Sequence, residues 1–410
     1  MIVRRLLSLI LAAGLALSGG AAMAREMAPH LTILVSIDGF RADYLDRADT
    51  PTLKALADDG ARGAMRPSFP SLTYPNHYTL VTGKRPDRNG VVGNEMEDAA
   101  IGGPKFTMGG ETANDPRWWR QARPFWVSVE QQGKTAGAMF WPGSEIVGTR
   151  PTHWMKYDGK LSHDARVDQI LAWLDTADGP PLAFTTLYFD VVDTEGHHYG
   201  PDSAEVRAAA AEVDRSLTRL VEGLKARGRF ENTDILVVAD HGMAPLPAAN
   251  RVVLDDLIDL SKVHLVTRGA VTSLSPAPGQ AKAVDAVFLG KALPHMTCWK
   301  KARIPTRFHY GRNKRVPAIV CLSETGWYTT TAAARAKPGK WDNKDGGAHG
   351  FDPYDPRMRA VFVGHGPSFK PGVVLPAFDN VDVYSILAKV TGVKPEKGDG
   401  SLKVVGQALR

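Results

Sequence analysis

Three aspartates and three histidines of this 410-residue chain stand in short motifs that suit metal binding. Two of the pairs are closely spaced, one adjacent and one four residues apart. Zinc takes carboxylate oxygen and imidazole nitrogen, and three protein ligands leave a zinc ion an open position for catalysis. Any one aspartate could instead cap a helix or a loop. The joint pattern is more specific and predicts two zinc ions, with the ligands Asp38, Asp193, His197, Asp240, His241 and His349.

Thr73 is the candidate nucleophile among the hydroxyl side chains. It precedes Pro75, a residue suited to the first turn of a helix, and a helix start offers free N–H groups to a phosphate oxygen. An ordinary helix-capping threonine would look the same. A hydroxyl attacks poorly unless a base or a metal activates it. The predicted zinc ligands would supply that activation, so they support Thr73 as the nucleophile. Asn94 could donate its amide to a phosphoryl oxygen.

The elements around these residues favour an α/β fold with a largely parallel sheet. Apolar runs over residues 31–37, 182–189 and 235–239 are typical of buried strands, and an aspartate follows each one. Helical patterns cover 51–59, 203–225 and 381–390, the last with Asn380 placed to cap it. Ligands bind at the carboxyl edge of such sheets. His349 is predicted to lie in a glycine-rich turn whose backbone can approach an ion closely.

The composition indicates one exported globular domain. Residues 1–24 carry a short basic start, an apolar run and a small-residue cleavage pattern, as a signal peptide does, which predicts a periplasmic or secreted protein with no membrane span after cleavage. Residues 25–410 are predicted to form a single catalytic domain, with an inserted subdomain at about 251–342. The formal charge of +6 favours anionic substrates, without the basic runs of a nucleic-acid binder.

The two cysteines allow two interpretations of their redox state. Cys298 and Cys321 are the only cysteines, and they could close one disulfide or stay as buried thiols. They are too far apart, with no CxxC, for a thiolate zinc site. Nucleophile-elbow, P-loop and dinucleotide-binding motifs are missing from the sequence.

The order of these motifs resembles that of the nucleotide pyrophosphatase/phosphodiesterase family of the alkaline phosphatase superfamily. The resemblance runs from about residue 31 to at least 390. The chain resembles a catalytic domain of bacterial type, without the extra modules of the larger animal members. The motifs that carry it are Ile37 to Arg41, Phe69 to Gly83, Asn94, Phe140 to Glu145, Asp193 to Gly200, Ala239 to Met243 and Ala348 to Asp352. The expected fold is an alkaline phosphatase-like, mostly parallel sheet between helices.

The resemblance implies a division of the ligands between two zinc ions. One ion would be held by Asp38, Asp240 and His241 and would also bind the Thr73 oxygen. The other would be held by Asp193, His197 and His349, on the side of the leaving oxygen. Asn94 and the backbone N–H of Thr73 would hold a phosphoryl oxygen. Thr73 would form a covalent threonyl-nucleotide intermediate, and the reaction would release nucleoside 5′-monophosphates.

The family also binds the nucleobase between aromatic rings, and Tyr74, Tyr157 and Tyr188 match those positions. Ordinary packing is the competing explanation for each tyrosine. Two other activities stay open: a phosphomonoesterase of the same superfamily, for which Lys156 leaves room, and a glycerophosphodiester or lipid-headgroup diesterase. A non-catalytic phosphate-binding protein is disfavoured because all the expected positions are filled. The sequence assigns no oligomeric state.

Overall fold

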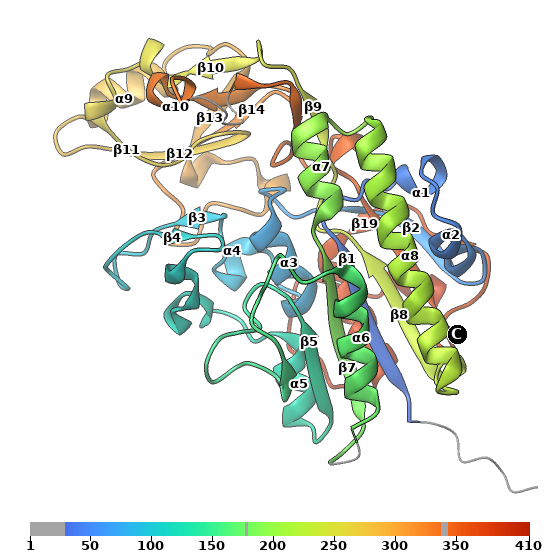
Figure 1. The fold of residues 1–410 in the computed structure, drawn as a ribbon. Coiled ribbons are helices and arrows are strands. Elements are labelled where there is room, and N and C mark those ends of the chain that lie inside the picture. The colour runs from blue at the N-terminus through green and yellow to red at the C-terminus, as the bar shows by residue number, and fades with distance from the viewer. Residues whose placement is uncertain (1–28, 177–178, 338–342) are drawn as a thin grey trace, which may run out of the picture.

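The computed structural model describes residues 29–176, 179–337 and 343–410. The predicted signal peptide, residues 1–24, lies outside the described residues. A nine-stranded sheet forms the centre of the fold, in the order β18-β2-β17-β8-β1-β7-β5-β6, with β19 also paired to β2 (Figure 1). Its strands are β1 (Leu31–Ile37), β2 (Ala61–Arg66), β5 (Thr135–Met139), β6 (His153–Trp154), β7 (Leu182–Phe189), β8 (Thr233–Val238), β17 (Ala360–His365), β18 (Val373–Val374) and β19 (Phe378–Asp379).

The sheet is mixed but mostly parallel. Strand β1 pairs in parallel with β7 on one side and β8 on the other. Strand β17 alone in this sheet, among the described residues, runs antiparallel to its neighbours β8 and β2. Every residue of β1 is buried, as expected for a strand covered on both faces. The predicted α/β class and mostly parallel sheet are confirmed.

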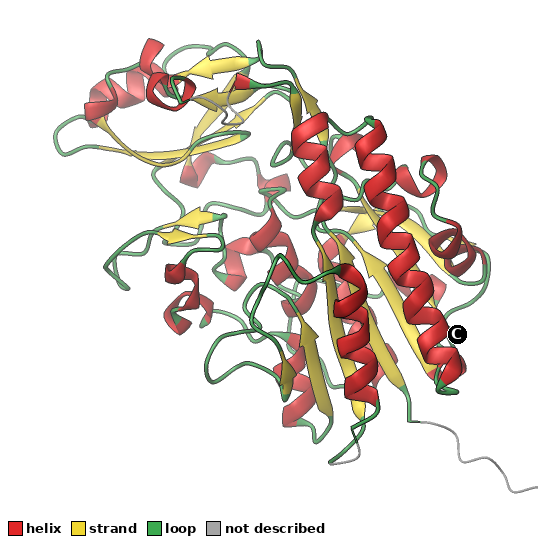
Figure 2. Ribbon diagram, in the orientation of Figure 1, coloured by secondary structure: helices red, strands yellow, loops and turns green. Residues whose placement is uncertain are grey.

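Helices cover both faces of the sheet (Figure 2). Helices α2, α6 and α8 pack together on one face, and α3, α5 and α11 on the other. Ser203 caps the long helix α8 by accepting a hydrogen bond from the N–H of Val206. The helices are α1 (Tyr44–Arg47), α2 (Pro51–Asp58), α3 (Thr73–Thr82), α4 (Pro86–Asn89), α5 (Phe125–Gln131), α6 (His163–Leu174), α7 (Val191–Tyr199), α8 (Ala204–Ala226), α9 (Ala281–Phe288), α10 (Ala332–Arg335) and α11 (Val383–Thr391).

The predicted cap of the closing helix is wrong. Helix α11 begins at Val383 without a side-chain cap, after a 3-10 turn over Asn380–Asp382. The Asn380 side chain is buried instead, where it donates to Oδ1 of Asn76 and accepts from the hydroxyl of Ser68. A buried amide needs such partners, so Asn380 ties α11 to α3 rather than capping a helix.

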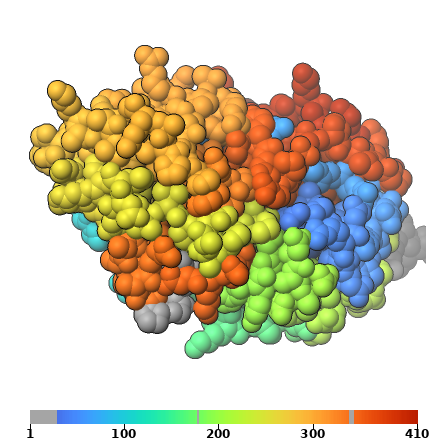
Figure 3. Space-filling model, turned by 90° about the horizontal axis from the view of Figure 1, so that it is seen from above, coloured from blue at the N-terminus to red at the C-terminus, as the bar shows by residue number. Residues whose placement is uncertain are grey.

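A smaller four-stranded antiparallel sheet, in the order β11-β12-β14-β13, stands above the carboxyl ends of the central strands (Figure 1). It has its own apolar cluster, which includes Leu274, Val284 and Phe288. Seen from above, its yellow and orange residues gather on one side of the molecule (Figure 3). The strands of this region are β10 (Arg251–Val253), β11 (Val263–Thr267), β12 (Val271–Pro276), β13 (Met296–Lys300), β14 (Ile319–Ser323) and β15 (Tyr328–Thr330), with β10 paired to β15.

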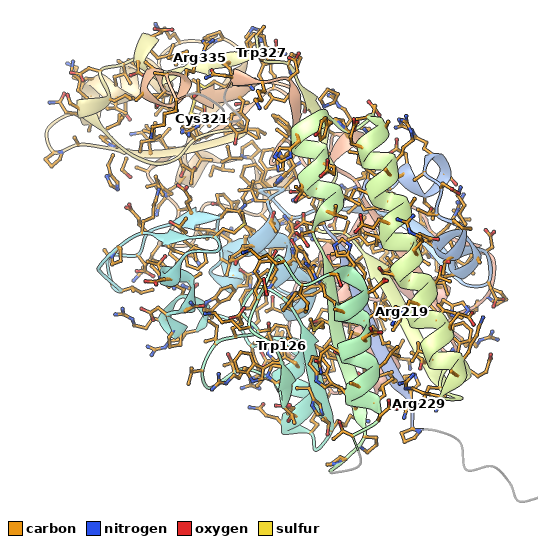
Figure 4. The ribbon with its side chains drawn as sticks, viewed as in Figure 1. Trp126, Arg219, Arg229, Cys321, Trp327 and Arg335 are labelled. Carbon is orange, nitrogen blue, oxygen red and sulfur yellow. A yellow bond between two sulfur atoms is a disulfide. The ribbon has the colours of Figure 1, made fainter. Side chains whose placement is uncertain are left out.

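The two cysteines lie opposite each other in this smaller sheet. Cys298 of β13 is in register with Cys321 of β14, and the two form a disulfide (Figure 4). The question that the sequence left open is answered in favour of the bond. The boundaries predicted for the inserted subdomain, 251–342, stay a prediction, and residues 338–342 lie outside the described residues.

Two short strand pairs complete the fold. Strand β9 (Ala244–Leu246) pairs with β16 (Gly346–Ala348). The chain passes through β9 on its way from the central sheet to the smaller one and through β16 on its way back, so the two connections lie side by side. Helix α7 packs against β16. The other pair joins β3 (Glu95–Met96) and β4 (Phe106–Thr107). None of the described helices is long and apolar enough to cross a membrane.

Candidate active site

Three adjacent strands bring the three predicted aspartates to one edge of the sheet. Asp38 directly follows β1, Asp240 follows β8 after one residue, and Asp193 lies in the first turn of α7, just after β7. Gly39 lies between them: its N–H donates to Oδ1 of Asp240 at 3.2 Å. A Cβ on Gly39 would come within 2.9 Å of Oδ1 of Asp193, and its φ of +68° also favours glycine. The glycine therefore lets the carboxylates converge.

The first cluster, called here the Asp240 group, consists of Asp38, Asp240 and His241. Their ligand atoms all lie within 4.8 Å of one another. Nε2 of His241 is 2.9 Å from Oδ2 of Asp240 and 3.6 Å from Oδ1 of Asp38. Nδ1 of His241 donates to the carbonyl oxygen of Gly242 at 2.9 Å. That bond places the ring N–H away from the cluster and leaves the Nε2 lone pair for a metal.

The second cluster, called here the Asp193 group, consists of Asp193, His197 and His349, again with ligand atoms within 4.8 Å of one another. Asp193 and His197 share one face of α7 because they are four residues apart, with Oδ2 and Nε2 3.3 Å apart. Nε2 of His349 is 3.7 Å from Oδ1 of Asp193. Both histidines donate Nδ1–H to backbone carbonyls, those of Gly347 and Ser71. Their Nε2 atoms therefore face the cluster.

Two glycines bring α7 close to His349. A Cβ on Gly346 would lie 2.2 Å from the carbonyl oxygen of His197, and one on Gly347 would lie 2.5 Å from that of Gly196. The sequence suggested that these glycines let the backbone approach an ion. Their close contact is instead with α7, and it sets His197 and His349 side by side, with ring centroids 5.0 Å apart.

The side chains of both groups fit divalent cations. Oδ1 of Asp38, Oδ1 of Asp193 and Oδ2 of Asp240 are buried and accept no hydrogen bond within the described residues. Burial, followed by the charges of Asp240 and Asp193, raises the pKa of Asp38 well above its usual value. Such crowded carboxylates need positive charge. Burial and then the neighbouring His241 lower the pKa of His349 to about 3, so its imidazole is neutral, the form that binds metals.

Thr73 stands at the start of α3, next to the Asp240 group. Leu72 occupies the capping position, so Thr73 is the first helical residue and not an ordinary cap. Its hydroxyl is 3.3 Å from Nε2 of His241, and the residue is 7% exposed. The helix start leaves the Thr73 N–H without an acceptor among the described residues. Nearby, Oδ1 of Asn94 accepts a 3.0 Å hydrogen bond from the N–H of Tyr74, which leaves the amide nitrogen of Asn94 as a donor.

A cavity of about 400 Å³ adjoins Thr73 and is lined by all three predicted tyrosines. Tyr157 is 47% exposed. The ring of Tyr74 packs against Phe106. The hydroxyl of Tyr188 donates a 2.6 Å hydrogen bond to Oδ2 of Asp38, a contact that sequence reasoning missed. Stacking of a base on these rings stays a prediction. Lys156, on which the monoesterase alternative depends, also lines the cavity.

Sequence reasoning also missed His77. This buried side chain bonds the hydroxyl of Ser36 and the carbonyl oxygen of Thr73, at 2.8 and 3.0 Å, and lies 3.5 Å from Oδ2 of Asp240. It therefore links helix α3 to the Asp240 group. Its spacing of four residues from Thr73 on a predicted helix is a signal that could have identified it.

The family model described as "Type I phosphodiesterase / nucleotide pyrophosphatase" matches residues 32–352. The chain belongs to this family. It is a hydrolase of the nucleotide pyrophosphatase/phosphodiesterase class, as the sequence motifs predicted.

Relatives that match the chain carry names of the same class. An uncharacterized pyrophosphatase/phosphodiesterase of Schizosaccharomyces pombe is 33% identical over 384 residues, 90% of this chain and 78% of the relative. The bis(5′-adenosyl)-triphosphatase ENPP4 of Homo sapiens is 31% identical over 402 residues, 97% of this chain and 85% of the relative.

A solved structure shares the fold. Murine ectonucleotide pyrophosphatase/phosphodiesterase 5 superimposes with a TM-score of 0.86 at 31% identity, covering 93% of this chain and 100% of the murine one. The murine protein was studied as an inactive threonine-to-alanine variant in complex with AMP. This match extends the family assignment from the motifs to the arrangement of the whole sheet.

Proposed function

We propose that the protein is a two-zinc hydrolase that cleaves phosphodiester or pyrophosphate bonds of nucleotides through a threonyl-nucleotide on Thr73 and releases nucleoside 5′-monophosphates. The observation that carries the proposal is the position of the Thr73 hydroxyl, 3.3 Å from Nε2 of His241 and beside two clusters of three ligand side chains. The donor set of both clusters, carboxylate oxygen and imidazole nitrogen, suits zinc. The Asp240 group would hold one ion and the Asp193 group the other.

Bound zinc would lower the pKa of the attacking hydroxyl and stabilise charge on the attacking and leaving oxygens. The protein's own side chains position the reaction. The Thr73 hydroxyl loses its proton to solvent as Oγ1 forms a bond to phosphorus, while the bond from phosphorus to the leaving oxygen breaks and the leaving group departs with that electron pair. A water molecule then gives up a proton as its oxygen attacks phosphorus, the bond to Oγ1 breaks, and Oγ1 takes up a proton so that the hydroxyl is restored. The nucleoside 5′-monophosphate leaves.

The remaining phosphoryl oxygen needs donors of its own. The amide nitrogen of Asn94 and the N–H of Thr73 are both available at the start of α3. Helix starts stabilise anions because their N–H groups point outward and the helix dipole is positive there. Donors already in place when charge develops on phosphorus are among the largest contributions to such catalysis.

The nucleoside would enter the cavity lined by Tyr74, Tyr157 and Tyr188. Stacking on aromatic faces tolerates any base, so we expect several nucleotides to serve as substrates. The name of the human relative, a bis(5′-adenosyl)-triphosphatase, and the AMP complex of the murine one agree with a nucleotide substrate.

The deciding assay compares thymidine 5′-p-nitrophenyl phosphate, a diester, with p-nitrophenyl phosphate, a monoester. The proposal predicts a higher kcat/KM for the diester. A monoesterase needs extra cationic groups for the additional phosphate charge, and Lys156 is the one lysine or arginine among the described residues that line the cavity beside Thr73. Faster monoester turnover would overturn the proposal. Glycerophosphocholine in the same assay tests the lipid-headgroup alternative.

Export is part of the same proposal. The signal peptide pattern of residues 1–24 predicts a mature chain that starts at Arg25 and works in the periplasm or outside the cell. Mass spectrometry of the protein recovered after expression of the full chain in a bacterial host tests this. An intact Met1 in the exported fraction would contradict it.

A further inference from the structure

The smaller sheet region carries more positive charge than the whole chain. Residues 251–337 contain 14 Lys and Arg but five Asp and Glu, a formal charge of +9, whereas the whole chain has +6. Seven of these cations lie within residues 300–315, called here the basic segment, and no Asp or Glu occurs from residue 299 to residue 323. The segment begins at the last residue of β13 and ends before β14. The positive charge of the protein is therefore concentrated in one connection of the smaller sheet.

The basic segment folds back on itself. The N–H of Lys301 donates to the carbonyl oxygen of Ala318 at 2.9 Å, and its Nζ donates to the carbonyl oxygen of Val316 at 3.1 Å. A Cβ on Gly311 would lie 2.2 Å from the carbonyl oxygen of Lys301, and the φ of +111° at Gly311 also favours glycine. The two halves of the segment therefore lie side by side, which brings cations from both halves together.

Two charged side chains attach the segment to the rest of the fold. Arg315 is buried, pairs with Asp98 at 2.8 Å and donates to the carbonyl oxygen of Gly90 at 2.7 Å. The carboxylate of Asp87, in helix α4, accepts hydrogen bonds of 2.7 to 3.0 Å from the N–H groups of residues 311–313. Arg315 and Asp87 thus hold the backbone of the segment, and other cations of the segment are left at the surface.

Three of the surface cations have no counterion. Arg303, Arg312 and Lys314 are exposed and have no ion-pair partner among the described residues. Ion pairs with aspartates occupy three other cations of the segment. Unpaired charges of one sign that lie close together create a positive potential, which attracts an external polyanion.

The large aromatic rings of the segment do not face solvent fully. Phe308 is 2% exposed, and Tyr310 is half-buried with its hydroxyl donating to a backbone carbonyl at 2.7 Å, so His309 is left as the exposed ring. Single-stranded nucleic acids bind to exposed aromatic rings on which their bases stack. The helical parts of the segment, the 3-10 turns Lys301–Arg303 and Thr306–Phe308, are too short to read a duplex groove. A bilayer with anionic headgroups needs only the charge.

We propose that the basic segment is a docking surface for a bilayer that carries anionic phospholipids, with Arg303, Arg312 and Lys314 against the headgroup phosphates. The contact is peripheral, since none of the described helices is long and apolar enough to cross a membrane. Each Lys or Arg beside such a surface strengthens binding about fivefold, so three of them give a reversible attachment that salt weakens. The proposal does not depend on the reaction at Thr73.

Co-sedimentation with lipid vesicles tests the proposal. The wild type is expected to bind vesicles of phosphatidylcholine mixed with phosphatidylglycerol, and not vesicles of phosphatidylcholine alone. Binding should disappear in about 1 M salt, where the Debye length is about 3 Å. The combined variant Arg303→Glu, Arg312→Glu, Lys314→Glu is expected to bind at least about 10-fold more weakly. Its Tm, measured by calorimetry, should match that of the wild type because all three side chains are exposed.

The matched control combines Lys134→Glu, Arg207→Glu and Arg215→Glu, which reverse three exposed cations outside the segment. This control changes the net charge equally and should keep vesicle binding within about 3-fold of wild type. An equal loss in both triple variants overturns the proposal. So does a wild type that binds both kinds of vesicle alike, or neither, and this result needs no variant.

Single-stranded DNA, tested on the Thr73→Ala protein to prevent turnover, covers the other class of polyanion. We expect the three reversals to change DNA binding less than vesicle binding. DNA binding that the reversals abolish, together with a wild type that ignores the anionic vesicles, would assign the surface to nucleic acid and overturn the proposal.

Discussion

The hydroxyl of Tyr188 donates a 2.6 Å hydrogen bond to Oδ2 of Asp38, while Oδ1 of the same carboxylate is buried without a hydrogen bond among the described residues. One oxygen is therefore fixed by the protein and the other is left for a cation. Groups that hold a metal ligand in place commonly affect metal affinity or activity 10- to 100-fold. Tyr188 thus holds a candidate metal ligand in place and also lines the cavity beside Thr73.

Tyr188→Phe removes this hydrogen bond and keeps the ring. We expect zinc affinity at the Asp240 group to fall by about 10- to 100-fold, with a smaller change in nucleotide KM because the aromatic wall is intact. Competition titration with a zinc chelator measures the affinity. Tyr157→Phe removes a hydroxyl from the same cavity without touching Asp38 and should leave zinc affinity unchanged. Identical zinc affinity in Tyr188→Phe and wild type would contradict the role of the hydroxyl.

Asn94→Ala removes the predicted donor to the phosphoryl oxygen. We expect kcat to fall about 100- to 1,000-fold, as when one such donor is lost elsewhere, with the zinc content unchanged. Asn94→Asp keeps the acceptor for the N–H of Tyr74 but not the donor, so it should lose activity as well. Steady-state kinetics with thymidine 5′-p-nitrophenyl phosphate give the result. A kcat within about 3-fold of wild type in both variants would exclude this role.

The two ligand groups should lose their ions separately. Asp38→Asn and Asp193→Asn are each expected to lower the content from two zinc ions per chain toward one, because each removes a carboxylate from a different group. Elemental analysis after dialysis measures this. Loss of both ions from each variant, or of neither, would contradict the division into two groups.

The difference in Tm between Asp38→Asn and the wild type should change sign when zinc is added. Without metal, Asp38→Asn is expected to raise the Tm, because burial and two neighbouring carboxylates disfavour its charge. With zinc present the same variant should have the lower Tm, because the wild type gains more from binding. Calorimetry with zinc and with a chelator measures the Tm of both proteins in each condition and shows whether their order reverses. A lower Tm for the variant in both conditions would show that the carboxylates do not repel.

Gly347→Ala tests the contact between α7 and β16. The new Cβ would lie 2.5 Å from the carbonyl oxygen of Gly196, and overpacking of this kind typically costs about 1–3 kcal/mol. We expect a lower Tm and weaker zinc binding at the Asp193 group, since α7 carries Asp193 and His197. Gly406→Ala is the control, because its nearest contact is 3.4 Å away. Unchanged zinc binding in Gly347→Ala would refute the coupling.

The motifs predicted much of this site because metal ligands need particular residue types. Asp38, Asp193 and Asp240 could be placed at one sheet edge from three apolar runs, since parallel strands end there. The antiparallel direction of β17 could not be predicted, because a short apolar run carries no information about direction. Sequence could not place the backbone carbonyls of Ser71, Gly242 and Gly347 on the histidines either, since any residue supplies a carbonyl.

Features that depend on long-range packing were missed for a related reason. Asn380 looked like a helix cap because capping is local, but its amide is bound to Asn76, 304 residues away in the chain. The role of Gly347 depends on a helix that precedes it by about 150 residues, as its hydrogen bond to His197 shows. A cavity of about 450 Å³ beside the Asp193 group is lined by Tyr199 of α7 and Tyr328 of β15, and neither segment carries a motif that points to the other.

The central claim is a covalent bond between Thr73 and the nucleotide. Rapid acid quenching of the zinc-loaded enzyme during turnover, followed by digestion and mass spectrometry, tests it most directly. The account predicts a nucleoside-monophosphate adduct on the peptide that contains Thr73, and neither adduct nor turnover in Thr73→Ala. Full diester hydrolysis by Thr73→Ala, or an adduct located on another residue, would contradict it.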